Sequence, residues 1–352
     1  MPNAKENLVA AAEEREAMEH VRAVSREKAK TKEAQLLLKA SEQRVEELED
    51  AVAAYESLRS ADTKPIVIKR KSRSSSKKPN HTFLALASDW HCAETVEASE
   101  TGGRNEHNIE IGEERAYNYF RSLANLVKEQ QGRFNIDDLV LWLGGDFMVG
   151  ELHGIESARS CPLPPLEEVS HVKRILTSGI DFLLNELDVK RIHIPCNQGN
   201  HGRTTDRTRY RMGSSYSYEA YLYRDLANSY SGNSRLDWDV SDEHYKVSDV
   251  AGFRVLFHHG DNIRYASGVA GLVMPFRRKS LQLASTYSHD LFCIGHFHQY
   301  GAYSGTGMTN GSLVGWGSYA AGTGLPFESP AQITALIDHD RRALGRVMPI
   351  WV

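Results

Sequence analysis

The chain has 352 residues, of which 41% are hydrophobic and 9% aromatic, a composition that excludes a fully disordered chain. Its formal net charge of −4 at pH 7 excludes a generally basic nucleic-acid binder, so any attraction to phosphate must come from local patches. The four cysteines form no C-x-x-C pair and no apolar run reaches 18 residues, so we expect no zinc knuckle, no membrane contact and a cytoplasmic protein.

Residues 1–60 are predicted to form a long helical segment. From residue 4 onward this segment has neither proline nor glycine and is rich in strong helix formers. Its second half carries apolar side chains at the a and d spacing of a heptad, at Leu38, Val45, Leu48, Val52 and Tyr55. Fewer than four regular heptads are present. A homo-oligomer that pairs through a coiled coil therefore stays open beside a solvated helix or a helical hairpin.

Residues 61–80 are predicted to be a linker. Six lysines and arginines fall within the ten residues 69–78, interleaved with serines. Such a segment cannot bury a core, so it is expected to be flexible and solvated. It is either a plain spacer or a basic tether that touches a polyanion.

The remaining residues, 81–352, are predicted to form one α/β domain. Strands are expected at 83–89, 138–146, 191–195, 244–249, 253–258 and 290–295, with strand-like runs at 312–320, 332–338 and 345–352. Helices are expected at 113–131, 167–187, 216–229 and 269–287. The early alternation of strand and helix favours β-α-β units, and the later part favours antiparallel pairs. The core is therefore expected to hold a mixed sheet or two sheets.

Five predicted strands are followed by the same restricted set of side chains, which are carboxylates, imidazoles and one amide, and four of the five sets have a glycine beside them. These residues are Asp89 and His91, Asp146, Asn200 and His201, His258 and His259, and His296 and His298. Ligands of α/β sheets collect outside the carboxyl ends of the strands, so these side chains are expected to share one cleft. They are ligand types for Mn, Fe, Zn or Co. There are too many for one tetrahedral ion, and they suit two ions that share a carboxylate.

The order D-x-H, G-D, G-N-H, H-G and G-H-x-H resembles the signature of the calcineurin-like metallophosphoesterases over roughly residues 81–320, with a looser similarity to their DNA-repair nuclease branch. The resemblance implies a four-layer α/β/β/α sandwich, here preceded by the N-terminal helix, and two divalent ions, Mn first with Fe, Zn or Co as alternatives. It implies one ion on Asp89, His91 and His298. It implies the other on Asn200, His259 and His296, with Asp146 as the bridge. His201 would face the substrate as a catalytic residue.

Two positions depart from the family pattern, and one pair is ambiguous. Many relatives have an acid directly after G-N-H, where this chain has Gly202; either another carboxylate such as Asp206 replaces it or His201 works unassisted. Val149 stands where many relatives have Asp or Asn. Of the adjacent histidines, His259 is favoured as the ligand because ligands of this type in the family usually precede glycine directly, and strand alternation turns His258 to the other face.

The substrate is predicted from the arginines that follow His201. Guanidinium groups bind phosphate in a bidentate fashion, and Arg203 and Arg207 are the candidate substrate-binding residues among Arg203, Arg207, Arg209 and Arg211. Tyrosines interleaved with them could stack on bases. A nucleic-acid phosphodiesterase acting on DNA or RNA is favoured over a phosphomonoesterase or a small-nucleotide phosphodiesterase. An adaptor with a degenerate site is disfavoured because every ligand position is filled.

Overall fold

The computed structural model describes residues 4–60, 78–152, 160–266 and 271–352, and the chain divides into two compact units, Met1–Ser74 and Ser75–Val352. Most of the linker expected at 61–80 lies outside the described residues. The globular unit has its first strand at Asn80, one residue inside the expected linker. Across the described part of the chain, no helix has both the length and the apolar character needed to cross a membrane.

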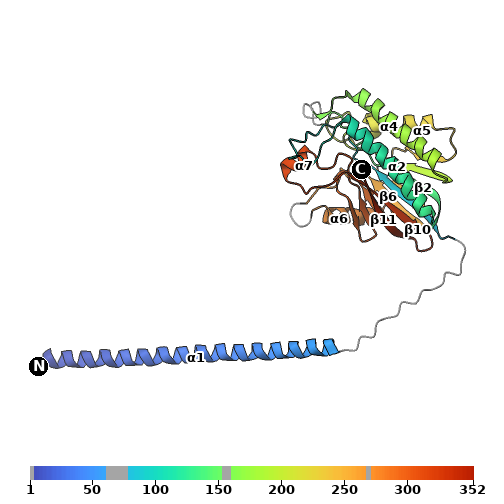
Figure 1. Cartoon of the computed structure of the whole chain (residues 1–352). Helices are drawn as coiled ribbons and strands as arrows, with labels where there is room; N and C mark the ends of the chain where they lie inside the picture. The colour runs from blue at the N-terminus through green and yellow to red at the C-terminus, as the bar shows by residue number, and fades with distance from the viewer. Residues whose placement is uncertain (1–3, 61–77, 153–159, 267–270) are drawn as a thin grey trace. The chain divides into compact units, whose positions relative to one another are not determined.

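The N-terminal unit is built on a single helix, α1 (Ala4–Ser60), labelled in Figure 1. Its continuity follows from the absence of proline and glycine over this range. The apolar side chains at heptad spacing are each more than half exposed at Leu38, Val45, Leu48 and Val52. Pairing of two copies through this helix stays a prediction.

The first sheet of the globular unit has six strands in the order β11-β10-β1-β2-β3-β4. The strands β1 to β4 run parallel, and β10 is antiparallel to both β1 and β11. The parallel part confirms the β-α-β units expected from the sequence. The strand bounds are β1 (Asn80–Ala87), β2 (Asn135–Leu143), β3 (Arg191–Pro195), β4 (Leu236–Asp239), β10 (Ala331–Asp338) and β11 (Ala343–Trp351).

The second sheet has five strands in the order β5-β6-β7-β9-β8 and is mixed. Its outer pairs, β5 with β6 and β8 with β9, are antiparallel, whereas β6–β7 and β7–β9 are parallel. The later part of the chain is therefore only partly antiparallel. The strand bounds are β5 (Lys246–Val250), β6 (Phe253–His258), β7 (Leu291–Ile294), β8 (Gly301–Tyr303) and β9 (Gly307–Thr309).

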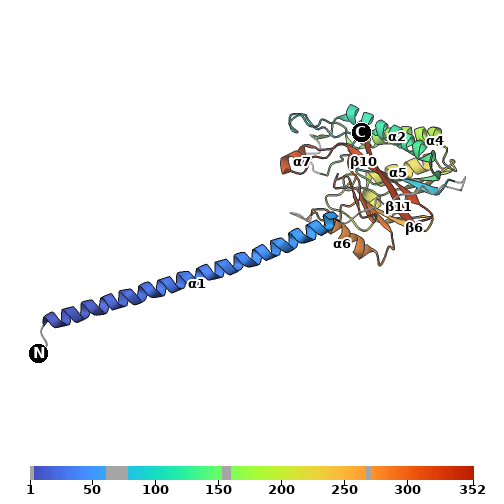
Figure 2. The same cartoon turned by 60° about the horizontal axis from the view of Figure 1, so that its bottom comes forward.

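The two sheets pack face to face, with helices on both outer faces. Alternate residues of β1 point to opposite sides, so Phe83 packs toward the helices while Leu84 packs between the sheets with Phe257 of β6. The helices α2 (Ile109–Gln131), α4 (Pro165–Glu186) and α5 (Tyr218–Ser229) cover the first sheet. On the second sheet, α6 (Val273–Leu283) stacks Phe276 on Phe292, their ring centroids 5.1 Å apart. Figures 1 and 2 show these helices on opposite sides of the unit. The four-layer α/β/β/α sandwich is confirmed.

Three details of the predicted elements were wrong. The strand expected at 312–320 is a buried loop followed by α7 (Ser318–Thr323), because Gly315 adopts a left-handed φ of +76° and the Leu313 N–H donates to the Asp89 carbonyl. The strands expected at 83–89 and 138–146 end earlier, at Ala87 and Leu143. The short strands β4, β8 and β9 were not predicted, since three or four residues carry almost no alternation signal.

Candidate metal centre

The carboxyl ends of strands from both sheets meet at one edge of the sandwich. The loop after β1 carries Asp89 and His91, and the loop after β2 carries Asp146. The loop after β3 carries Asn200 and His201. His259 directly follows β6, and His296 and His298 follow β7. Residues that lie more than 200 positions apart in the sequence therefore meet at this edge.

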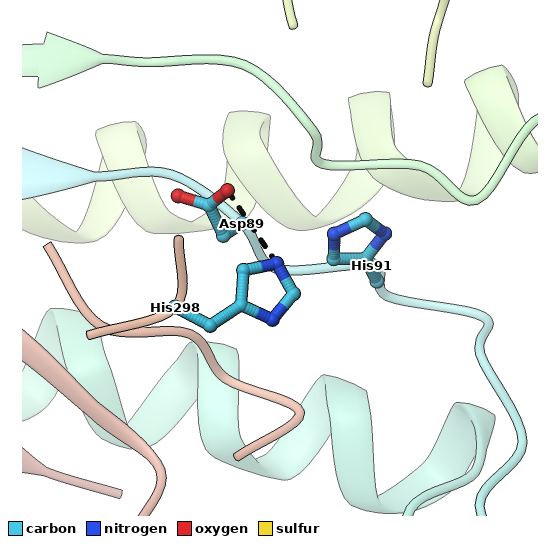
Figure 3. Close-up of side chains that lie close together, drawn as sticks. All are labelled: Asp89, His91 and His298. Carbon is cyan, nitrogen blue, oxygen red and sulfur yellow. Dashed lines mark ion pairs between the residues drawn. The ribbon is translucent and has the colours of Figure 1, made fainter. Parts of the chain in front are cut away.

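The first donor set consists of Asp89, His91 and His298, whose ligand atoms all lie within 4.8 Å of one another. Figure 3 shows Asp89 and His91 on one segment and the ring of His298 reaching them from another. The Nε2 atom of His298 is 3.6 Å from Asp89 Oδ1. A carboxylate and two imidazoles at this spacing form a site for a borderline divalent cation.

The second donor set consists of Asp146, His259 and His296, again with ligand atoms within 4.8 Å. His259 Nε2 lies 2.9 Å from Asp146 Oδ2 and 3.2 Å from Asn200 Oδ1, so the amide joins this set. Asp146 also lies within 4.8 Å of His91, together with His201. Asp146 is therefore close to donors of both sets, which is the position a shared carboxylate needs.

The two adjacent histidines after β6 lie in different surroundings. The Nδ1 atom of His259 is 2.8 Å from the carbonyl oxygen of Gly144, which leaves Nε2 directed at the second donor set. The ring of His258 instead stacks on Tyr245 at 4.5 Å, and its Nδ1 accepts the Gly260 N–H at 2.9 Å. Only His259 therefore directs a ring nitrogen at Asp146.

The backbone is strained at the donors themselves. Left-handed φ values are costly for residues other than glycine and gather at functional sites, where the surrounding structure holds them in place. Five donor residues have them: Asp89 (58°), His91 (41°), Asp146 (54°), His296 (68°) and His298 (54°). Their side-chain directions are thus set by unusual backbone turns at the strand ends.

Glycines beside the donors allow the loops to approach closely. A Cβ atom added at Gly199 would lie 2.0 Å from Asp146 Oδ1, and one at Gly295 would lie 2.3 Å from Asp89 Oδ2. The loops are also bonded to each other through the carboxylates. Asp89 Oδ1 accepts the His296 N–H at 2.8 Å, and Asp146 Oδ1 accepts the His201 N–H at 2.8 Å. Each aspartate therefore joins two loops as well as offering a donor oxygen.

Two buried glutamates, which the sequence did not single out, hold these loops through hydrogen bonds to their backbone N–H groups. Glu219, in the first turn of α5, accepts the N–H groups of Phe147 and Gly199, each at 2.7 Å. Glu168, in the first turn of α4, accepts those of Val149 and Gly150 at 2.6 and 3.0 Å. Burial raises the pKa of Glu219 to about 7, and the charge of Asp146 adds to this effect. A lone glutamate in a helical pattern gives no sequence signal of this role.

Glu219 also explains why residue 202 is glycine. A Cβ atom at Gly202 would lie 2.7 Å from Glu219 Cγ, so an acidic side chain there would displace the glutamate. The His201 ring is oriented differently from the expectation that named Asp206: its Nδ1 lies 2.8 Å from the carbonyl oxygen of Val149. A carbonyl can only accept, so Nδ1 carries the proton and a neutral ring keeps its lone pair on Nε2.

The protonation states of His91 and His298 suit a cation. Burial lowers the pKa of His91 well below its usual range and that of His298 to about 3, so both rings are neutral at physiological pH. Burial raises the pKa of Asp89 to about 7; the His259 charge opposes this shift and the charge of Asp146 adds to it. Both ring nitrogens of His91 are buried, and within the described ranges neither has a hydrogen-bond partner. Unpaired buried nitrogens are costly, so the donor set fits a bound metal ion.

A cavity of about 280 Å³ adjoins the second donor set, and Asn200 and His259 form part of its wall. Arg203 lines it, with its guanidinium bonded to the carbonyl oxygens of Thr205 (3.0 Å) and Asp206 (3.2 Å). Arg207 is not among the described residues that line the cavity, and its side chain is exposed. Of the two candidate substrate-binding arginines, only Arg203 therefore lines this cavity.

The layers of the sandwich and the order of the donors along the chain agree with the resemblance seen in the sequence. The chain has the calcineurin-like metallophosphoesterase fold. The chain matches no protein-family model and no curated protein.

Solved structures give low similarities. A predicted phosphoesterase from Streptococcus pneumoniae is 11% identical with a TM-score of 0.29, over 73% of this chain and 84% of that one. A dimetal phosphatase from Danio rerio is 10% identical with a TM-score of 0.34, over 78% and 99%. Vps29 from Entamoeba histolytica in complex with zinc is 11% identical with a TM-score of 0.29, over 76% and 96%.

Proposed function

We propose that the chain is a two-metal phosphoesterase whose substrate is a nucleic-acid phosphodiester. The observation that carries the proposal is the pair of donor sets that both include or approach Asp146. Asp89, His91 and His298 would hold one ion, and Asn200, His259 and His296 the other. Mn is the first choice for both ions, with Fe, Zn and Co as alternatives, because neutral imidazoles, carboxylates and an amide oxygen suit this group.

When bound, two such ions lower the pKa of a water molecule and polarise the phosphoryl oxygens. The protein itself supplies orientation and a proton. The Val149 carbonyl fixes the His201 ring through Nδ1, so Nε2 is the ring nitrogen that would act on the substrate. With the ring protonated, Nε2–H donates to the leaving oxygen, which departs as an alcohol while His201 returns to its neutral form. The His201 and His91 rings meet edge to face at 4.6 Å, which keeps His201 beside the first donor set.

A nucleic-acid substrate is supported by the arginines that follow His201. Arg203 is half-buried beside Asn200, where it can grip a phosphate next to the scissile one. Arg207 is exposed on the same loop and would add long-range attraction to a polyanion. DNA and RNA both offer these phosphates.

A second candidate is a phosphomonoester or a small nucleotide, with the uncharged part of the substrate in the cavity. Its volume of about 280 Å³ lies near the lower limit of small-molecule pockets, which is enough for one nucleotide. A substrate of this size would need Arg203 but not Arg207.

A substrate panel separates the two. Full-length protein loaded with Mn is given bis(p-nitrophenyl) phosphate, p-nitrophenyl phosphate, and end-labelled single- and double-stranded DNA and RNA, with chelator and Asp146→Asn as controls. We expect the diester to be hydrolysed faster than the monoester and at least one nucleic acid to be cut. Hydrolysis of the monoester alone would favour the second candidate. Hydrolysis of none of them with any of the four metals would refute the phosphoesterase.

A further inference from the structure

The cavity beside the second donor set has walls that are fixed in place. The loop 203–217 is closed at its base, where Thr204 N–H donates to the Tyr216 carbonyl and Tyr218 N–H to the Gly202 carbonyl, each at 2.8 Å. Across the cavity, His244 Nε2 lies 3.0 Å from the Tyr210 carbonyl oxygen. These contacts join the loop 203–217, here called the arginine loop, to the segment between β4 and β5. The cavity is therefore closed on two sides.

The charges that line this cavity do not form a phosphate cradle. Arg203 and Arg209 line it, but the exposed acids Asp242 and Glu243 and the partly exposed Asp261 line it as well. Arg224 is already paired with Asp242 at 2.8 Å. A phosphate in the cavity would meet several carboxylates, whereas an uncharged group with hydrogen-bond donors would meet suitable acceptors.

Two further features of the wall suit a flat aromatic ligand. The Arg209 guanidinium lies 4.5 Å from the ring centroid of Tyr216, which gives an extended stacking surface. Gln198, two residues before Asn200, also lines the cavity, and its amide oxygen is buried with no hydrogen-bond partner among the described residues. Such an atom is costly unless a ligand bonds it.

We propose that this cavity receives one nucleobase of the substrate, the base next to the scissile phosphate. The base stacks against the Arg209–Tyr216 pair, and an N–H group on its edge donates to Gln198. This proposal rests on the proposed function and deepens it by naming the group recognised. A base in the cavity cannot remain in a double helix, so the enzyme should act on single strands, frayed ends or small nucleotides in preference to intact duplex.

The test measures binding rather than turnover. Full-length, Mn-loaded protein is titrated with a short fluorescent single strand whose phosphorothioate linkages resist hydrolysis, and with strands that lack the base at each position in turn. We expect one position at which loss of the base weakens binding about tenfold to a hundredfold. Tyr216→Leu should weaken binding of the intact strand by a similar factor. It should add little to the loss already caused by that abasic position, because both remove the same contact.

Matched variants separate stacking from structural damage. Tyr216→Phe keeps the ring and should bind the intact strand almost as wild type does. Tyr221→Leu changes a more exposed tyrosine on α5 that does not line the cavity, and it should change nothing. We call the non-additive loss between Tyr216→Leu and the abasic position coupling. Coupling in a dinucleotide would show that a small nucleotide is sufficient, whereas coupling only in longer strands would identify a nucleic acid.

Two results would overturn the proposal: an abasic scan with no sensitive position, or a Tyr216→Leu variant that weakens intact and abasic strands alike. Hydrolysis of bis(p-nitrophenyl) phosphate, which has no nucleobase, reports on the metal centre separately. Hydrolysis of this ester without coupling would reject the base cavity and keep the phosphoesterase. Coupling without hydrolysis of any ester would keep the base cavity and reject the phosphoesterase.

Discussion

The loop that presents Asn200 and His201 and the loop that carries the arginines follow one another directly after β3, yet they are built in opposite ways. The first is packed so tightly that no side chain fits at Gly199, and its backbone is bonded to Asp146 and Glu219. The second is closed at its base, but Arg207 and Arg209 are exposed. Donor positions are thus set by the backbone, whereas the reach of the arginines is set by long side chains.

This difference predicts two kinds of mutational effect. A change at a donor should remove metal and turnover together for every substrate. A change at an arginine should give a graded loss that depends on the substrate and on salt.

The adjacent histidines give the largest contrast. His259→Ala should lose metal from the second donor set and lower turnover about a thousandfold or more, because an ion contributes several kcal/mol to the transition state. His258→Ala should keep its metal, because that ring stacks on Tyr245 and does not face Asp146. Metal content and hydrolysis of bis(p-nitrophenyl) phosphate are measured for both. The opposite pattern would show that the donor was assigned to the wrong histidine.

His201 should behave as a proton donor and not as a metal ligand. His201→Gln is expected to keep both ions and to lower the rate about 10²–10⁴-fold on DNA, the range for a positioned acid or base. The loss should be smaller with nitrophenyl esters, whose leaving groups need little protonation. Rates with the two leaving groups and the metal content are compared. Loss of metal would place His201 among the ligands, in keeping with its position near His91 and Asp146.

Glu219 should act through the loops that it holds. Glu219→Gln keeps the size of the side chain but removes one of two acceptor oxygens, and an effect of about 10–100-fold on metal affinity or activity is expected. Glu167→Gln, an exposed acid in the first turn of α4, is the matched control and should change neither. Metal titration with activity at saturating metal separates weaker binding from slower chemistry. Equal effects in both variants would argue against the role of Glu219 in holding these loops.

The same variant has a predicted pH dependence. The pKa of Glu219 is raised by burial from 4.5 to about 7, so between these values the folded state binds more protons than the unfolded state. The contribution of this carboxyl to stability therefore falls as pH rises through that range. The free energy of unfolding of Glu219→Gln, relative to wild type, should increase from pH 5 to pH 8 in chelator. A constant difference would mean that the Glu219 pKa is near its ordinary value.

The arginine loop should give the smallest and most conditional effects. Arg203→Ala should impair cleavage of nucleic acid more than that of a small ester, because it is proposed to hold a neighbouring phosphate. Arg207→Ala should weaken binding of a single strand and reduce the slope of log K against log salt by about one. Arg191→Ala, at the far end of β3, is the control. Unchanged binding in both loop variants would favour the small-phosphoester substrate.

The sequence was most informative where the chemistry is restricted. Asp89, Asp146 and His259 could be found because carboxylates and imidazoles that follow five buried strands, four of them with a glycine alongside, are a rare combination. The alternation of strands and amphipathic helices predicted only an α/β domain with a mixed sheet or two sheets, whereas the four layers were implied by the family resemblance. Strand ends were less accurate because the donors occupy left-handed turns just beyond the last sheet residue.

The supporting residues could not have been found in this way. Glu168 and Glu219 look like ordinary acids in the first turns of their helices, and only the packing of helix against loop places them behind the donors. The part played by Val149 is equally invisible, because a backbone carbonyl orients His201 regardless of the side chain. The run at 312–320 misled because apolar residues bury equally well in a loop beneath the centre.

The central claim is that Asp146 is shared by two metal sites, and counting ions tests it most directly. Wild-type protein and Asp146→Asn are loaded with Mn, freed of excess metal, and analysed for metal per chain. The wild type should hold about two ions. The variant should hold fewer than one, because both sites lose a donor at once. A wild type with a single ion, or a variant that keeps two, would contradict the shared centre.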